Sequence, residues 1–105
     1  MYDRRQRIRY SADLHCAWRG ETAMPTSRII DIGPGGCFIA SPVLPRVGEE
    51  VEIWLALENA DAPAGFVGRA AYTLGRLGFG VQFVHSTDRA QEQLGEWLLE
   101  HARFD

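Results

Sequence analysis

The sequence predicts a mainly β protein: a six-stranded antiparallel, split β-barrel with a C-terminal α-helix. Three observations support this fold class. Apolar and polar residues alternate with a period of two along most of the chain, as they do in half-buried strands. The alternating segments are short and end in turn residues at a spacing of about ten residues, which is typical of small barrels. Only near the C-terminus does the period change to that of an amphipathic helix.

Four of the expected strands lie in the first half of the chain. Residues 12–18 alternate apolar with polar positions, and a turn-forming cluster follows them. Residues 26–32 and 37–40 are predicted as two short strands, separated by a loop at 33–36 that contains three glycines. The clearest alternation covers residues 50–58, where one face is apolar and the other largely polar. The apolar face of this last strand comprises Val51, Ile53, Leu55 and Leu57.

The second half of the chain predicts a hairpin and then a helix. Residues 66–74 and 79–84 are the expected strands, because the Gly-Arg-Leu-Gly segment at 75–78 supplies the residues of a tight turn. The helix is predicted to begin at Asp88, which would cap it; Ser86 is the other candidate cap. The apolar stripe of the helix comprises Ala90, Leu94, Trp97, Leu98 and His101. Such a stripe predicts that the helix covers an end or a side of the barrel.

Length and composition limit the possible functions. The chain has 105 residues, enough for one core, so we expect a single domain over residues 1–105, with 1–10 as a flexible, arginine-rich arm. All 11 basic residues are arginine. The absence of lysine excludes P-loop, kinase and Schiff-base chemistry. The formal net charge of -3 argues against general nucleic-acid binding, which needs many cationic contacts with phosphates.

The sequence predicts no export signal, membrane span, disulfide or metal site. The N-terminus lacks the apolar core of a secretory signal, and no apolar run approaches the roughly 20 residues of a membrane helix. Cys16 and Cys37 lie among apolar residues without a C-x-x-C spacing, so we expect two free, buried thiols. His15, His85 and His101 are far apart in sequence, which argues against a metal centre. The expected location is cytoplasmic.

Four arginines are concentrated at the N-terminus: Arg4, Arg5, Arg7 and Arg9. This cluster is either a solvated basic tail or an anion-binding clamp. Guanidinium groups form forked hydrogen bonds with phosphate and with the O6 and N7 edge of guanine, and they stack on flat rings. If the cluster is a clamp, a guanine nucleotide is therefore a suitable ligand.

A glycine-rich loop with the sequence DIGPGG follows the second expected strand at residues 31–36. It is not a G-x-G-x-x-G dinucleotide motif, because Phe38 stands at the third glycine position and a strand follows. One interpretation is a tight turn between strands. The other is a ligand-binding loop, in which glycines with positive φ approach the ligand closely and Asp31 accepts the N1 and N2 protons of a guanine.

Together these two segments resemble the paired motifs of the PilZ domain family. Arg5-x-x-x-Arg9, preceded by Arg4, is similar to the RxxxR motif. Residues 31–36, about twenty residues further on, are similar to the (D/N)xSxxG motif. Further similar segments are GEEV at 48–51, GFGVQF at 78–83 and the closing helix. The resemblance therefore covers nearly the whole chain.

The resemblance implies a six-stranded barrel that binds cyclic di-GMP, with no catalytic residue, metal or cofactor. Arg4, Arg5 and Arg9 would hold phosphates and guanine edges. Asp31 would bind the Watson–Crick edge of a guanine, and Gly36 would permit close packing. We therefore expect a receptor, not an enzyme, that passes a conformational or surface change to an unidentified effector protein, in the control of motility or biofilm formation.

The chain departs from the family pattern at Gly33, where the motif has serine. The missing hydroxyl removes one hydrogen bond, typically about 0.5–1.5 kcal/mol. We therefore expect Gly33 to remain part of the binding loop, with its backbone available to the ligand, but with lower affinity. The replacement Gly33→Ser is expected to raise the affinity.

Two further interpretations remain open. The chain is alternatively a PilZ-like adaptor that binds cyclic di-GMP weakly or not at all, with Trp54 and the helix as its docking face. Tyr72 is either a base-stacking residue or a packing residue. An enzyme is not expected, because no nucleophile with a supporting base is recognisable in the sequence.

Overall fold

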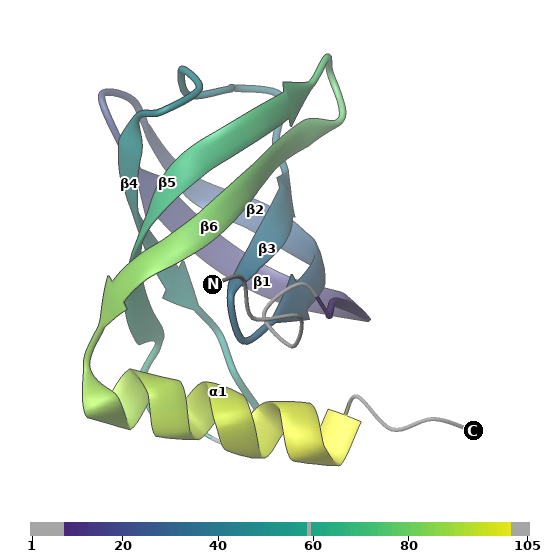
Figure 1. The fold of residues 1–105 in the computed structure, drawn as a ribbon, viewed down its shortest axis with the longest axis vertical. Coiled ribbons are helices and arrows are strands. Elements are labelled where there is room, and N and C mark those ends of the chain that lie inside the picture. Colours follow the sequence, from purple (N-terminus) through teal and green to yellow (C-terminus); the bar gives the residue numbers. More distant parts are fainter. Residues whose placement is uncertain (1–7, 59, 102–105) are drawn as a thin grey trace, which may run out of the picture.

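The computed structural model describes residues 8–58 and 60–101, which form a closed antiparallel barrel and one helix. Its elements are β1 (Tyr10–Arg19), β2 (Ala23–Gly33), β3 (Gly36–Ala40), β4 (Glu50–Leu55), β5 (Ala64–Leu74), β6 (Gly78–Ser86) and α1 (Asp88–His101). Around the barrel the strands follow the order β1-β2-β3-β6-β5-β4. Figure 1 shows α1 lying across one end of this barrel. The predicted fold class, six strands and a C-terminal helix, is confirmed.

The apolar positions that alternate along the strands fill the interior of the barrel. Trp18 of β1 and Phe79 of β6 pack edge to face, with ring centroids 4.9 Å apart, and both are almost completely buried. The helix contributes Ala90, Leu94 and Trp97 to the same core. These three residues of the predicted stripe attach the helix to the barrel by burial of apolar surface, the main favourable term in folding, whereas Leu98 is half-buried and His101 is exposed.

Irregular pairing bends several strands. The register shifts between Ser11 and Leu14 in the β1–β2 pair, and between Ile29 and Asp31 in the β2–β3 pair. An extra residue in one strand increases the local twist and re-aims the neighbouring side chains. Ile30, at the second shift, is exposed although both of its neighbours in β2 are more buried. These bulges help a sheet of only six strands to close.

The largest difference from a predicted strand end in the second half of the barrel is at β4. Strand β4 ends at Leu55, before the predicted end at residue 58, yet Leu57 is buried. The backbone N–H of Ala56 still donates to the carbonyl of His15 at 3.0 Å, so the pairing with β1 ends where the chain turns away. The predicted hairpin between β5 and β6 is present. Its turn needs glycine at both ends, since φ is 51° at Gly75 and 146° at Gly78.

The residue that caps the helix is Thr87, so the prediction of Asp88 or Ser86 is wrong. The Thr87 hydroxyl accepts a hydrogen bond from the Ala90 N–H at 3.1 Å, and the Thr87 carbonyl accepts one from the Gln91 N–H. Asp88 instead lies in the first turn, where its charge is favourable beside the helix N-terminus. At the other end, the indole N–H of Trp97 donates to Glu58 at 3.2 Å.

Both cysteines are buried and unbridged, as predicted. Burial raises the pKa of the Cys16 thiol to about 12. The pKa of Cys37 is also raised, first by burial and then by the neighbouring Cys16. Both side chains therefore pack as small apolar groups.

We expect Thr87→Ala to lower the free energy of unfolding by about 1 kcal/mol, because it removes the hydroxyl that caps the helix. Asp88→Ala removes only a charge in the first turn and should lower the free energy of unfolding by less. Urea unfolding followed by circular dichroism measures both variants, with Ser86→Ala as the control. A larger loss for Asp88→Ala than for Thr87→Ala would contradict the assignment of the cap.

The thiols should resist modification in the folded protein. The thiolate is the nucleophile, and the raised pKa values keep both thiols protonated at pH 8. We expect no reaction of the native chain with a disulfide reagent during the time in which the guanidinium-denatured chain titrates both of its cysteines. Rapid reaction of either thiol without denaturant would show that it is accessible.

Candidate functional site

The antiparallel pairing of β1 and β2 brings Arg9, the last residue of the first motif, to the glycine-rich motif at one end of the barrel wall. Tyr10 pairs with Ile32 and Ser11 with Asp31, so Arg9, which immediately precedes β1, lies beside the end of β2. The Arg9 Nη1 atom donates a hydrogen bond to Asp31 Oδ1 at 2.9 Å. Both side chains remain partly exposed, 28% for Arg9 and 36% for Asp31. The pair is therefore formed and still open to a ligand.

Gly36 lies against this ion pair. A Cβ atom at this position would lie 2.1 Å from the carbonyl oxygen of Val81 and 3.1 Å from Arg9 Nη2. Gly36 pairs with Gln82 on the neighbouring strand β6. Only glycine leaves room here for the β6 backbone and for the guanidinium of Arg9.

Gly33 is required for a different reason from the one predicted. Its φ is not in the positive region, nor is that of Gly36, so their conformational freedom is not what the loop uses. Instead, a Cβ atom at Gly33 would lie 1.9 Å from the carbonyl oxygen of Ile8. The missing side chain makes room for the backbone of residue 8, the residue before Arg9.

This contact argues against the expectation that Gly33→Ser would strengthen binding. A serine at this position would have to displace Ile8, and with it the neighbouring Arg9 that contacts Asp31. The hydroxyl of the family motif therefore cannot be restored without moving the first residues that the structure describes.

Of the ligand-binding residues predicted from the sequence, the structure brings together Arg9, Asp31, Gly33 and Gly36. Arg4 and Arg5 of that set lie outside the described residues, as does Arg7. Gln82 was not predicted; it is exposed and next to Gly36 across the β3–β6 pair. No local sequence signal identifies Gln82, because its position depends on the pairing of distant strands.

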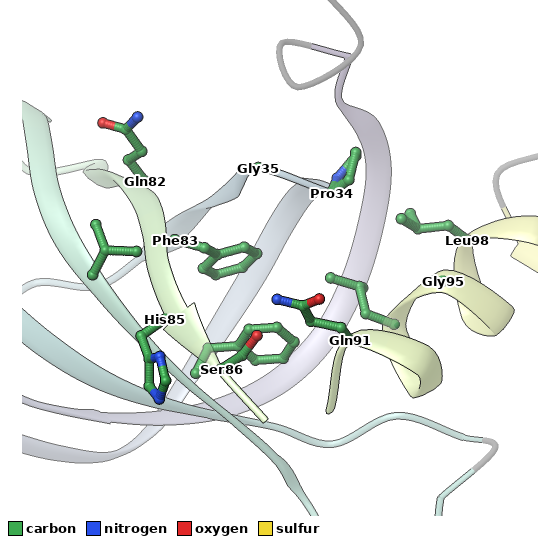
Figure 2. Close-up of a pocket in the computed structure, with 12 residues that line it drawn as sticks. Pro34, Gly35, Gln82, Phe83, His85, Ser86, Gln91, Gly95 and Leu98 are labelled. Carbon is green, nitrogen blue, oxygen red and sulfur yellow. The ribbon is translucent and has the colours of Figure 1, made fainter. Parts of the chain in front are cut away.

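A cavity of about 370 Å³ adjoins the loop at Pro34 and Gly35. Figure 2 shows it between Pro34 and Gly35, the end of β6, and α1. Phe66 and Phe83 stack in its wall with centroids 4.6 Å apart. The polar residues of the lining are Gln82, His85, Ser86 and Gln91, and no carboxylate or arginine contributes to it. Its chemistry therefore differs from that of the charged face at Arg9 and Asp31.

The two aromatic candidates lie elsewhere on the surface. Tyr72 of β5 is 41% exposed and lies beside Phe38, with ring centroids 6.2 Å apart. Trp54 of β4 is half-buried, and the guanidinium of Arg19 lies 5.6 Å from its ring centroid. Trp54 is thus partly covered by a neighbour on β1.

Within residues 8–58 and 60–101, no group of three or more His, Cys, Asp or Glu side chains is placed to hold a metal ion. In the same part of the chain, no helix is both long and apolar enough to cross a membrane.

Comparisons with known proteins give a family match and a similar fold. The model of the PilZ domain family matches residues 3–100. The solved structure of the Bacillus subtilis inhibitor of motility MotI/DgrA is similar, with a TM-score of 0.79, 14% sequence identity and coverage of 96% of this chain. The chain spans 52% of that protein, about half of its length. No curated protein sequence gives a significant match.

We expect Gly36→Ala to lower the free energy of unfolding by about 1–3 kcal/mol, a typical cost of overpacking. The added methyl group would collide with the β6 backbone at Val81. The control is Gly65→Ala, also in a strand, where a Cβ atom would make an ordinary contact of 3.7 Å with Trp54. Urea unfolding of both variants checks the difference, and equal stabilities would contradict the close packing at Gly36.

Proposed function

Because the chain belongs to the PilZ domain family, whose members are generally receptors for cyclic di-GMP and not enzymes, we propose that it binds cyclic di-GMP at the face that carries Arg9 and Asp31. The observation that supports this proposal is the ion pair between these residues, which lies against Gly36. It unites one residue of the RxxxR motif with two of the glycine-rich motif.

The chemistry of the pair suits a guanine nucleotide. Asp31 uses Oδ1 to accept a hydrogen bond from Arg9, and a carboxylate has further lone pairs on its second oxygen. Oδ1 also keeps one lone pair, so the two oxygens together can accept the N1 and N2 protons of a guanine. The guanidinium of Arg9 has five donors, so it can hold Asp31 and still donate to a phosphate or to a guanine edge. In this proposal Arg4 and Arg5 supply the further cationic contacts.

Gly33 fits this proposal as the position that lets Ile8, and with it Arg9, approach the glycine-rich motif. The motif serine would offer a hydroxyl, whereas here the Ile8 carbonyl occupies the space of a side chain. The ion pair between Arg9 and Asp31 holds both charged groups in place before the ligand binds. This arrangement partly compensates for the lost hydrogen bond. Such preorganisation lowers the entropic cost of binding.

The proposed output is a change in the N-terminal segment. Residues 8–10 already lie on the barrel, so in this proposal ligand phosphates would draw the preceding residues of the expected arm, with Arg4 and Arg5, onto it and so alter the surface offered to an effector protein. The similarity to a protein described as an inhibitor of motility makes motility the first process to test.

The alternative is an adaptor with little affinity for the nucleotide. Two observations favour it: Gly33 offers no hydroxyl, and Asp31 already has a cationic partner in Arg9. Binding of an effector in the absence of cyclic di-GMP, together with no nucleotide binding, would support the adaptor.

Calorimetric titration with cyclic di-GMP tests the proposal. We expect Arg9→Ala and Asp31→Ala each to weaken binding by about tenfold or more, the cost of losing a hydrogen bond to a charged group. Arg89→Ala, an exposed arginine on α1, is the matched control and should bind like the wild type. Gly33→Ser should not bind more tightly, because it displaces Ile8.

Amide NMR spectra provide a second measurement. Residues 31–36 and Arg9 should shift together on addition of the ligand. No binding by the wild type at roughly 100 μM ligand, a concentration that detects even weak complexes, would contradict the proposed function.

A further inference from the structure

Two rows of paired residues run across the outer wall of the barrel next to the Arg9–Asp31 pair. The first row comprises Asp31 of β2, Phe38 of β3, Gly80 of β6 and Tyr72 of β5. The second row comprises Gly36 of β3, Gln82 of β6 and Arg69 of β5. Both rows face outward, because the residues that alternate with them are completely buried: Cys37, Ile39, Phe79 and Val81. One continuous face therefore connects Asp31 with β5.

The first row ends in one exposed aromatic ring, that of Tyr72. The Tyr72 ring lies directly on Gly80, since a Cβ atom at Gly80 would be 2.2 Å from its Cε1 atom. The Phe38 ring is next to it, tilted by 31°. Phe38 is 5% exposed and Tyr72 is 41% exposed, so Tyr72 is supported by the sheet and by Phe38 while much of its ring remains open. A supported, exposed ring is suited to stacking with a nucleobase.

The second row ends in Arg69, a cation for which the described residues show no ion pair. Arg69 is exposed and, within the part of the chain that the structure describes, makes no ion pair; its cross-strand neighbour on β4 is the exposed Glu50. Arg9 lies against Gly36, at the other end of this row. Strands β3 and β5 are two strand spacings apart, about 10 Å. Arg9 and Arg69 extend into this interval from its two ends. Gln82 lies between them and adds a neutral hydrogen-bonding amide.

We infer that the binding face for the cyclic dinucleotide extends across β6 to β5, where Arg69 contacts the phosphate that Arg9 does not reach and Tyr72 stacks on a base. This inference rests on the proposed function and adds two residues that lie outside both sequence motifs. A cyclic dinucleotide carries two phosphates and two bases. Arg9 and Asp31 serve one phosphate and one base, and Arg69 and Tyr72 offer the same pair of contacts on the far side of Gln82.

Calorimetric titration of cyclic di-GMP into Arg69→Ala tests the phosphate contact. We expect about tenfold weaker binding, in the range for a charge-assisted hydrogen bond at a partly exposed site. The matched control is Arg76→Ala, an exposed arginine in the turn between β5 and β6, which should bind like the wild type. Arg69→Lys keeps the charge but loses the fork, so its affinity should lie between those of the wild type and Arg69→Ala.

Tyr72 variants test the stacking contact. Tyr72→Phe keeps the ring and should bind like the wild type. Tyr72→Leu still covers Gly80 but removes the aromatic face, and should weaken binding by roughly fivefold to a hundredfold, the range measured for loss of one stacked base. Circular dichroism and urea unfolding establish that each variant is folded.

The outcomes separate this inference from the proposed function. If the wild type binds cyclic di-GMP and both Arg69→Ala and Tyr72→Leu bind it with the same affinity, the inference is overturned. The proposed site at Arg9 and Asp31 then remains intact. An equal loss in Arg76→Ala and Arg69→Ala would also overturn it, because the effect would then be one of general charge. No binding by the wild type would overturn both.

Discussion

The contact between the Ile8 carbonyl and Gly33 determines the geometry of the candidate site. Because no side chain separates them, the start of β1 lies close to the end of β2, and Arg9 is held within hydrogen-bond distance of Asp31. Gly36 then allows the same guanidinium to lie next to the β6 backbone. The charged face thus depends on Gly33 and Gly36. At these positions backbone atoms, and at Gly36 also the Arg9 side chain, occupy the space that a Cβ atom would need.

The barrel makes this arrangement possible because it divides its residues strictly between two sides. Inward positions such as Ile32 and Cys37 are completely buried and fix the register of β2 against β3. Their outward neighbours are then free to carry charge or to be glycine without a cost to the core. The same alternation continues through β6 to β5, which is why residues far apart in the sequence share one outer face.

Most of the fold could be predicted from the sequence, because strand alternation, the glycines of the β5–β6 turn and the helical stripe are local signals. What could not be predicted depends on distant contacts. Thr87 caps the helix although Asp88 is an equally good cap by composition. The need for glycine at position 33 comes from residue 8, and the place of Arg69 beside Gln82 comes from bulges and barrel closure, neither of which a residue pattern encodes.

The closure of the barrel also restricts how a partner protein can recognise this domain. Among the described strands, each has a hydrogen-bonded neighbour on both sides, so extension of the sheet by a strand from another chain, a common mode of peptide recognition, is not favoured. A partner must therefore read the side chains of the outer wall, the loops or the helix. Recognition of this kind responds to small rearrangements of surface groups and needs no change in the sheet itself.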